Sequence, residues 1–179
     1  MLNQISSAKS TANSVDEDVR ELLVGCHQRI RHFTEVATKL AHAQAAAQDE
    51  IRSAAEAVYR YYSVSLPLHE ADEEDTLRPR LDGVADERVH HALAAMHDQH
   101  LAIDDLLERL LPLLKMVSNN PETLTNAGAE MCSTAKALDE IFRAHLQLEE
   151  EVIFPAIDVL LNEQQRGDML REMRGRRKQ

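Results

Sequence analysis

The apolar residues between positions 93 and 114 recur at steps of three and four residues. Side chains at this spacing lie along one face of an α-helix, and three further segments of the chain show the same spacing. Only five glycines and five prolines occur in 179 residues, too few for the many turns of a β-rich protein. We therefore predict an all-α fold. The stripe that sets this expectation comprises Leu93, Met96, His100, Ile103, Leu107, Leu110 and Leu114.

Turn and capping signals divide the chain into four long helices. The form of a capping box at Ser14–Glu17 places the start of the first helix near residue 15, and an alanine-rich stretch ends it in the mid-40s. The second helix is expected to end by Asp82-Gly83, with a kink at Pro67. The third closes at residues 118–121, with a bend at Pro112, and the fourth follows.

Short connections between four amphipathic helices favour an up-down-up-down four-helix bundle. Beyond Pro155, the apolar segment 156–161 predicts a short extra C-terminal helix. We expect a disordered leader over residues 1–14, one bundle domain over 15–165, and a C-terminal helix end with a basic tail over 166–179.

Charge and hydropathy exclude several classes of partner. The formal net charge of −11 repels nucleic acid and anionic membranes, so we expect neither as a partner, and the basic stretch 171–178 is expected to be a solvated end. No apolar run reaches membrane-spanning length, and two cysteines make no disulfide framework. These features predict a cytoplasmic protein, and they leave open whether it pairs with a second copy.

One eleven-residue pattern occurs twice. HEADEEDTLRP at 69–79 and HLQLEEEVIFP at 145–155 share identical residues at four positions and similar residues at two more. Both read His-x-x-x-Glu-Glu-acid-x-aliphatic-x-Pro, which indicates an internal duplication of a two-helix unit.

The His-x-x-x-Glu core of this pattern suits metal binding. Residues four apart project from nearly the same face of a helix, so His69 with Glu73, and His145 with Glu149, can each hold a metal ion. A metal-free buried polar network is the alternative, but ionised groups in an apolar interior need strong partners. The neighbouring acidic residues are expected to form a solvated face: Glu70, Glu74, Asp75, Glu150 and Glu151.

Two further histidines lie at the same predicted height in the bundle. In an antiparallel hairpin, residues at one height are equally distant from the turn. The midpoints of 69 with 100, of 100 with 145 and of 27 with 69 all fall at predicted breaks between helices. We therefore expect His27 and His100 to join His69 and His145 at one level.

These residues resemble the hemerythrin-like, HHE cation-binding family over about residues 15 to 160. The resemblance implies a four-helix bundle around two iron ions with an oxo or hydroxo bridge, with one histidine and one His-x-x-x-Glu from each half. Its implied metal ligands in this chain are His27, His69, Glu73, His100, His145 and Glu149. The two glutamates would bridge the irons. Imidazole and carboxylate donors also suit zinc and manganese, so the residues alone leave the metal open.

The sequence departs from the oxygen-carrying members of that family in one position. Those proteins have a fifth histidine four residues from another on the third helix, whereas Met96 and Asp104 stand four residues either side of His100. His97 is the alternative ligand, although it points about 60° off the stripe. With this histidine missing, one more coordination position on the metal is left open or filled by water, which argues against simple reversible oxygen carriage.

Three classes of function follow from this sequence. The leading one is a non-haem di-iron protein that binds or senses O2, peroxide, nitric oxide or iron. The second is a di-iron enzyme that consumes peroxide or repairs nitrosative or oxidative damage. The third is a metal-independent helical interaction module.

Overall fold

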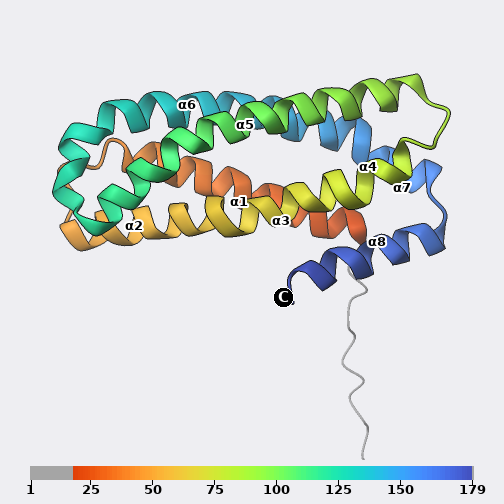
Figure 1. Cartoon of the computed structure of the whole chain (residues 1–179), viewed down its shortest axis with the longest axis horizontal. Helices are drawn as coiled ribbons and strands as arrows, with labels where there is room; N and C mark the ends of the chain where they lie inside the picture. Colours follow the sequence, from red (N-terminus) through yellow and green to blue (C-terminus); the bar gives the residue numbers. More distant parts are fainter. Residues whose placement is uncertain (1–17, 179) are drawn as a thin grey trace, which may run out of the picture.

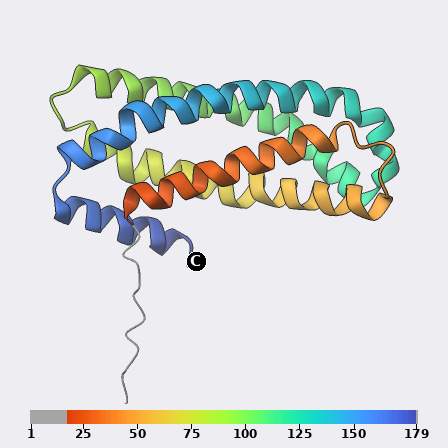
Figure 2. The same ribbon diagram turned by 180° about the vertical axis from the view of Figure 1, so that it is seen from behind.

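The computed structural model describes residues 18–178, which form helices and turns without a strand. The bundle helices run antiparallel and side by side, and a shorter C-terminal helix lies along the outside of one end of the bundle (Figures 1 and 2). This confirms the predicted all-α four-helix bundle with an extra C-terminal helix, but the position expected for that helix is wrong. The segment 156–161 continues the fourth bundle helix as far as Leu160, and the extra helix covers Glu163–Arg176. In chain order the elements are α1 (Val19–Leu40), α2 (Gln48–Arg60), η1 (Tyr61–Ser65), α3 (Leu66–Ala71), η2 (Asp72–Leu77), α4 (Arg78–Leu81), α5 (Glu87–Asn119), η3 (Pro121–Thr123), α6 (Leu124–Leu148), η4 (Glu149–Ile153), α7 (Phe154–Leu160) and α8 (Glu163–Arg176).

Each bundle helix contacts its two neighbours around the bundle. The second bundle helix comprises the consecutive elements α2 to α4, and the fourth comprises α6, η4 and α7. Contacts join α1 to α2, α2 to α5, α5 to α6, and α6 back to α1, which closes the ring. The four helices therefore enclose a single interior that buried side chains fill.

The first helix starts later than the sequence pattern predicts. Asp18 has extended backbone dihedrals and is the N-cap of α1, and its backbone N–H donates to Glu21 Oε2 at 3.3 Å. The helix thus begins at Val19, four residues after the predicted start, because Asp18 and Glu21 supply the capping pair. The predicted capping box at Ser14–Glu17 lies outside the described residues.

Three π-helical turns interrupt the second and fourth bundle helices. These are η1, η2 and η4, and each ends two residues before a proline: Pro67, Pro79 and Pro155. A proline ring clashes with the carbonyl one turn earlier and donates no hydrogen bond, so a wider turn before it relieves the clash. The disturbance expected at Pro67 takes this form, whereas α5 stays helical through Pro112.

The bundle core consists of two apolar clusters separated along the helix axes. The first includes Ile30, Leu66, Ile103 and Phe142, and the second includes Leu23, Leu77, Met96 and Phe154. The segments that join the two clusters along each bundle helix carry the predicted site residues. A polar layer therefore lies between two dry layers, which exclude water from it along the bundle axis.

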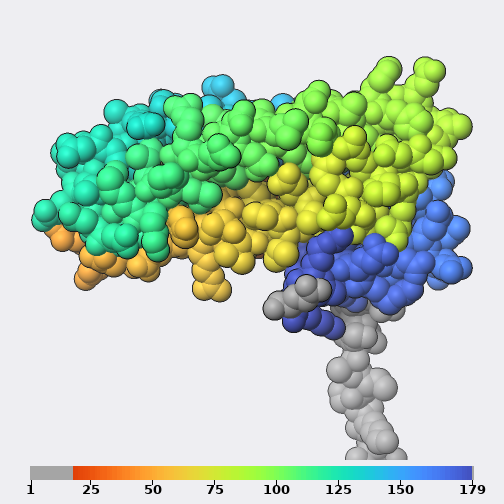
Figure 3. All heavy atoms as spheres, in the orientation of Figure 1, coloured from red at the N-terminus to blue at the C-terminus, as the bar shows by residue number. Residues whose placement is uncertain are grey.

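The C-terminal helix α8 packs on the bundle instead of projecting into solvent. Met169 and Met173 are fully buried in the second cluster, and α8 contacts η2 and α1. In Figure 3 its atoms lie directly against the second bundle helix. The expectation of a solvated basic end is therefore wrong for Arg176 and Arg177, which form ion pairs with the fully buried Asp72.

No helix within residues 18–178 combines the length and the apolar character that crossing a membrane requires.

Candidate metal centre

All six predicted site residues meet inside the bundle. His27 comes from α1, His69 from α3, His100 from α5 and His145 from α6, so each bundle helix supplies one histidine. Glu73 and Glu149 lie in the π-helical turns η2 and η4. None of the six is more than 4% exposed. The structure brings them together, and their role as ligands stays a prediction.

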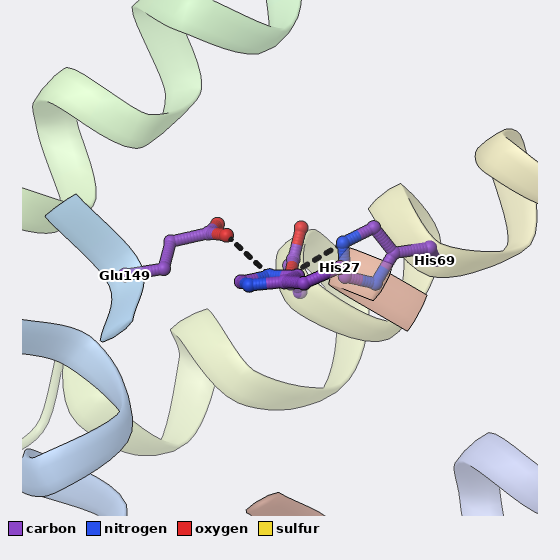
Figure 4. Close-up of side chains that lie close together, drawn as sticks. His27, His69 and Glu149 are labelled. Atoms are coloured by element: carbon purple, nitrogen blue, oxygen red, sulfur yellow. Dashed lines mark ion pairs between the residues drawn. The ribbon is translucent and has the colours of Figure 1, made fainter. Parts of the chain in front are cut away.

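The six residues form two overlapping groups that share both glutamates. His27 and His69 stand with the glutamates in one group, and His100 and His145 stand with them in the other. Within each group, one candidate ligand atom from every residue lies within 4.8 Å of the others. Figure 4 shows one end of this arrangement, where His27, His69 and Glu149 approach one another from different elements. Two overlapping groups of this kind are what a two-ion centre needs.

Each glutamate presents one oxygen to each pair of histidines. Glu73 places Oε1 3.1 Å from His69 Nε2 and Oε2 3.3 Å from His100 Nε2. Glu149 places Oε2 3.0 Å from His27 Nε2 and Oε1 3.4 Å from His145 Nε2. A carboxylate divided in this way between two sets of imidazoles has the arrangement of a bridging ligand.

Three of the histidines are oriented by hydrogen bonds on their outer nitrogens. His27 Nδ1 lies 2.7 Å from Glu150 Oε1, and His100 Nδ1 lies 2.8 Å from Glu74 Oε1. His145 Nδ1 lies 3.1 Å from the side-chain oxygen of Gln99. Because each partner is an acceptor, the imidazole proton belongs on Nδ1, and the lone pair of Nε2 points into the centre.

The inward-facing atoms lack hydrogen-bond partners. The buried Nε2 atoms of His27, His69 and His100 have none, nor do the four carboxylate oxygens of Glu73 and Glu149. Lone pairs then face lone pairs at about 3 Å in a dry interior, which is unfavourable without a cation or a proton between them. A neutral-imidazole and carboxylate donor set of this kind fits divalent transition-metal ions.

A comparison with known families supports this interpretation. Residues 18–157 match the family model described as the hemerythrin HHE cation binding domain. The chain belongs to this family. The match runs from the start of α1 to residue 157 within α7, and it includes both His-x-x-x-Glu motifs but not α8. Metal binding is accordingly the property that family membership and the buried His/Glu groups of this hemerythrin-like chain support together.

The acidic residues next to the glutamates are not simply a solvated face, and for Glu74 and Glu150 that expectation is wrong. Glu150 accepts from His27 across the bundle, and Glu74 accepts from His100. Each half of the duplicated motif therefore orients a histidine of the other half. The repeated Glu-Glu pair was the signal for this role, because the second glutamate is identical in both copies.

His97 takes a supporting position and not a ligand position. Its Nδ1 lies 3.0 Å from Glu74 Oε1, and its side chain is 43% exposed. Glu74 therefore connects a half-exposed histidine to His100 and also forms an ion pair with Arg78. These partners hold the pKa of Glu74 at about 2, against the opposing effect of its partial burial.

In the metal-free protein, burial shifts the pKa values of both glutamates and of two histidines of the centre. It raises the pKa of Glu149 to about 8 and that of Glu73 well above its ordinary value. It also lowers the pKa values of His69 and His145 well below theirs, so both imidazoles are neutral. Without metal the centre consequently retains protons on carboxyl groups near neutral pH.

We expect the metal-free protein to lose stability as the pH rises from about 6.5 to about 8. The pKa of Glu149 is 4.5 in its ordinary state and about 8 when folded, so the folded state holds a proton that the unfolded state has released. The free energy of unfolding then falls with pH, by on the order of 2 kcal/mol across this window for one proton. The lowered pKa values of His69 and His145 act in the opposite direction, chiefly below pH 6.5, and offset part of the loss in the first half unit above it.

Urea unfolding at pH 6.5 and pH 8 in the presence of a chelator measures this change. The metal-loaded protein is the control, because ligands must lose protons to bind metal and metal stabilisation therefore grows with pH. Stability that is constant or rises in the metal-free protein would contradict the assignment of these protons.

Proposed function

We propose that this chain is a non-haem di-iron protein that binds or senses a small molecule: O2, peroxide, nitric oxide or iron itself. The observation that carries the proposal is the division of the Glu73 and Glu149 oxygens between two pairs of histidines. Two carboxylates that can each span two ions favour a pair of metals sharing one task, and the absence of a thiolate from the cluster suits iron.

The donor count supports binding of an external molecule. Each group offers two imidazoles and two carboxylates, fewer donors than an octahedral iron accepts. His97 does not add a fifth imidazole, since it belongs to neither group of candidate ligands and its side chain is 43% exposed. Iron supplies the redox chemistry when bound, while the chain supplies orientation, exclusion of water and the outer acceptors for the imidazole protons.

An enzyme that consumes peroxide or repairs nitrosative or oxidative damage is the second candidate. One observation favours it. A hydrogen-bonded path runs from the half-exposed His97 through Glu74 to His100. Turnover of peroxide requires protons to move between solvent and the centre, and this path connects solvent to the outer nitrogen of His100 at the edge of the centre.

Metal analysis of protein purified without added metal tests the proposal. We expect about two irons per chain, because the two groups offer the same set of donors, two imidazoles and two carboxylates. We also expect a visible absorption in the oxidised protein. His69→Ala should lose metal, whereas His32→Ala, which replaces an exposed histidine of the first bundle helix, should retain it. Protein that holds only zinc, or no metal, would overturn the di-iron proposal.

Oxygen evolution from added peroxide would favour the enzyme, and a colour that cycles with O2 without turnover would favour the binding protein.

A further inference from the structure

A pocket of about 210 Å³ lies against His69 on the side of the bundle covered by α8. That volume is several times the share of one water molecule in the liquid, about 30 Å³, so it has room for a small polyatomic ligand. Its walls are formed by residues of α1, η1 and α3 and by Arg177, which directly follows α8. The polar groups that line it are Cys26, Arg29, Tyr61, Ser65, His69 and Arg177.

His69 differs from the other three histidines of the centre. Their Nδ1 atoms each meet an acceptor, from Glu150, Glu74 or Gln99. His69 is 2% exposed, and its Nδ1 has no hydrogen-bond partner. One nitrogen of the ring pairs with Glu73, and the other is turned away from it (Figure 4). An imidazole that binds metal through Nε2 carries its proton on Nδ1, so His69 is a donor that lacks an acceptor.

The walls of the pocket are positively charged in a chain of net charge −11. Two guanidinium groups line it and no carboxylate does. Arg29 makes its one side-chain hydrogen bond in the described chain to Cys26 Sγ, at 3.1 Å, and pairs with no carboxylate there. Arg177 lies 2.5 Å from Asp72 Oδ2, a carboxylate that it shares with Arg176, and Arg176 has a second, longer contact of 3.9 Å to Asp75 Oδ2. The pocket therefore has an excess of donors and positive charge.

We propose that this pocket binds a small oxyanion, which Arg29 and Arg177 hold and which accepts a hydrogen bond from His69 Nδ1. The anion would accept a hydrogen bond from His69, as glutamates accept one from His27 and from His100. Because Arg177 follows α8, beyond the matched residues 18–157, the site is an addition to the shared bundle. Binding of the anion does not depend on the di-iron proposal. Its coupling to the metal does rest on that proposal.

Cys26 provides the competing arrangement. Its sulfur lies 3.1 Å from Arg29 and 3.7 Å from Arg177, so a thiolate there could itself balance the two guanidiniums. A tetrahedral oxyanion and a planar carboxylate would both match the guanidinium donors. Sulfate and acetate are therefore the two probes.

Calorimetric titration of the full chain with each anion, at constant ionic strength set by chloride, tests the site. We expect saturable binding of at least one anion to metal-free and metal-loaded protein. Arg29→Gln should weaken it by about tenfold or more, since a charge-assisted hydrogen bond is lost. Arg29 pairs with no carboxylate in the described chain, so this variant leaves no buried carboxylate unpaired. Arg109→Gln, an exposed arginine on α5 that does not line the pocket, should bind like the original chain.

Two further measurements address His69 and Cys26. In iron-loaded protein, the anion should shift the visible absorption of the original chain, and the shift should weaken in Arg29→Gln in parallel with binding. Cys26→Ser should still bind the anion. The proposal is overturned by heats that do not saturate, by equal affinity in Arg29→Gln, or by binding that appears only in Cys26→Ser. Saturable binding without a spectral change would overturn the contact with His69. Failure of the chain to bind iron would contradict the di-iron proposal alone, since the metal-free titration still tests the pocket.

Discussion

Replacing Glu149 with glutamine is expected to reduce the metal content from about two ions per chain to one or fewer, with affinity falling more than about 100-fold. The carboxylate directs one oxygen to His27 and the other to His145. An amide keeps only one oxygen and turns an N–H donor toward the other metal position. Removing a residue that only hydrogen-bonds to a metal ligand already lowers metal affinity by about 10- to 100-fold. Glu149 is itself a proposed ligand, so its loss should cost more. Metal per chain by elemental analysis, and affinity by competition with a chelator, measure the effect.

The matched control is Glu151→Gln, two residues further along the same π-helical turn. Glu151 is exposed and accepts a hydrogen bond only from Gln147 within the described chain, so the variant should keep both ions. Metal-free Glu149→Gln should be at least as stable as the metal-free original, because a neutral amide replaces a buried carboxyl group. Two tightly bound ions in Glu149→Gln would show that this glutamate does not bridge them.

Removing both guanidiniums in the double variant Arg176→Gln/Arg177→Gln is expected to destabilise the protein by about 3 kcal/mol, near the lower end for breaking a buried ion pair. Asp72 is fully buried, and its two oxygens lie 2.8 Å from Arg176 and 2.5 Å from Arg177. The side chains of the arginines are 23% and 27% exposed, which weakens the effect relative to a wholly buried pair. Chemical unfolding of the metal-free protein measures the loss.

A compensating substitution separates the ion pair from general damage to α8. Adding Asp72→Asn removes the unpaired charge, so the triple variant should recover a large part of the stability. Arg171→Gln is the control on the same helix. Within residues 18–178 Arg171 pairs only with Asp168, on the exposed surface, so the change should affect stability little. No recovery in the triple variant would mean that α8 docks through its methionines and that the ion pairs contribute little.

The sequence by itself determined the fold class and the composition of the centre. Apolar residues at steps of three and four can be buried together only on one face of an α-helix, and four helices with such apolar faces pack into a bundle. The four-residue spacing of His69 with Glu73, and of His145 with Glu149, predicts a shared helix face, and the pairs stay together although both glutamates lie in π-helical turns. Turn midpoints were enough to place His27 and His100 at the same level, because antiparallel helices of equal rise keep their register.

Helix boundaries were less predictable, because several signals compete within a few residues. The Ser14 pattern and the Asp18–Glu21 pair both have capping chemistry, and the structure begins α1 at Val19. Pro67 predicts a disturbance, but whether the chain kinks or widens into a π-helical turn depends on the neighbouring helices.

Only the tertiary structure decided what surrounds the six site residues. Glu74 and Glu150 look like solvated acids in the sequence, and they become acceptors for His100 and His27 because the bundle brings the opposite half of the duplication against them. The basic C-terminal segment looks like a free end, yet its arginines reach Asp72 because two buried methionines dock α8 on the bundle. His69 alone is left facing a cationic pocket. Local spacing fixes which side chains share a helix face, whereas partners more than a hundred residues apart are fixed only when packing removes them from water together.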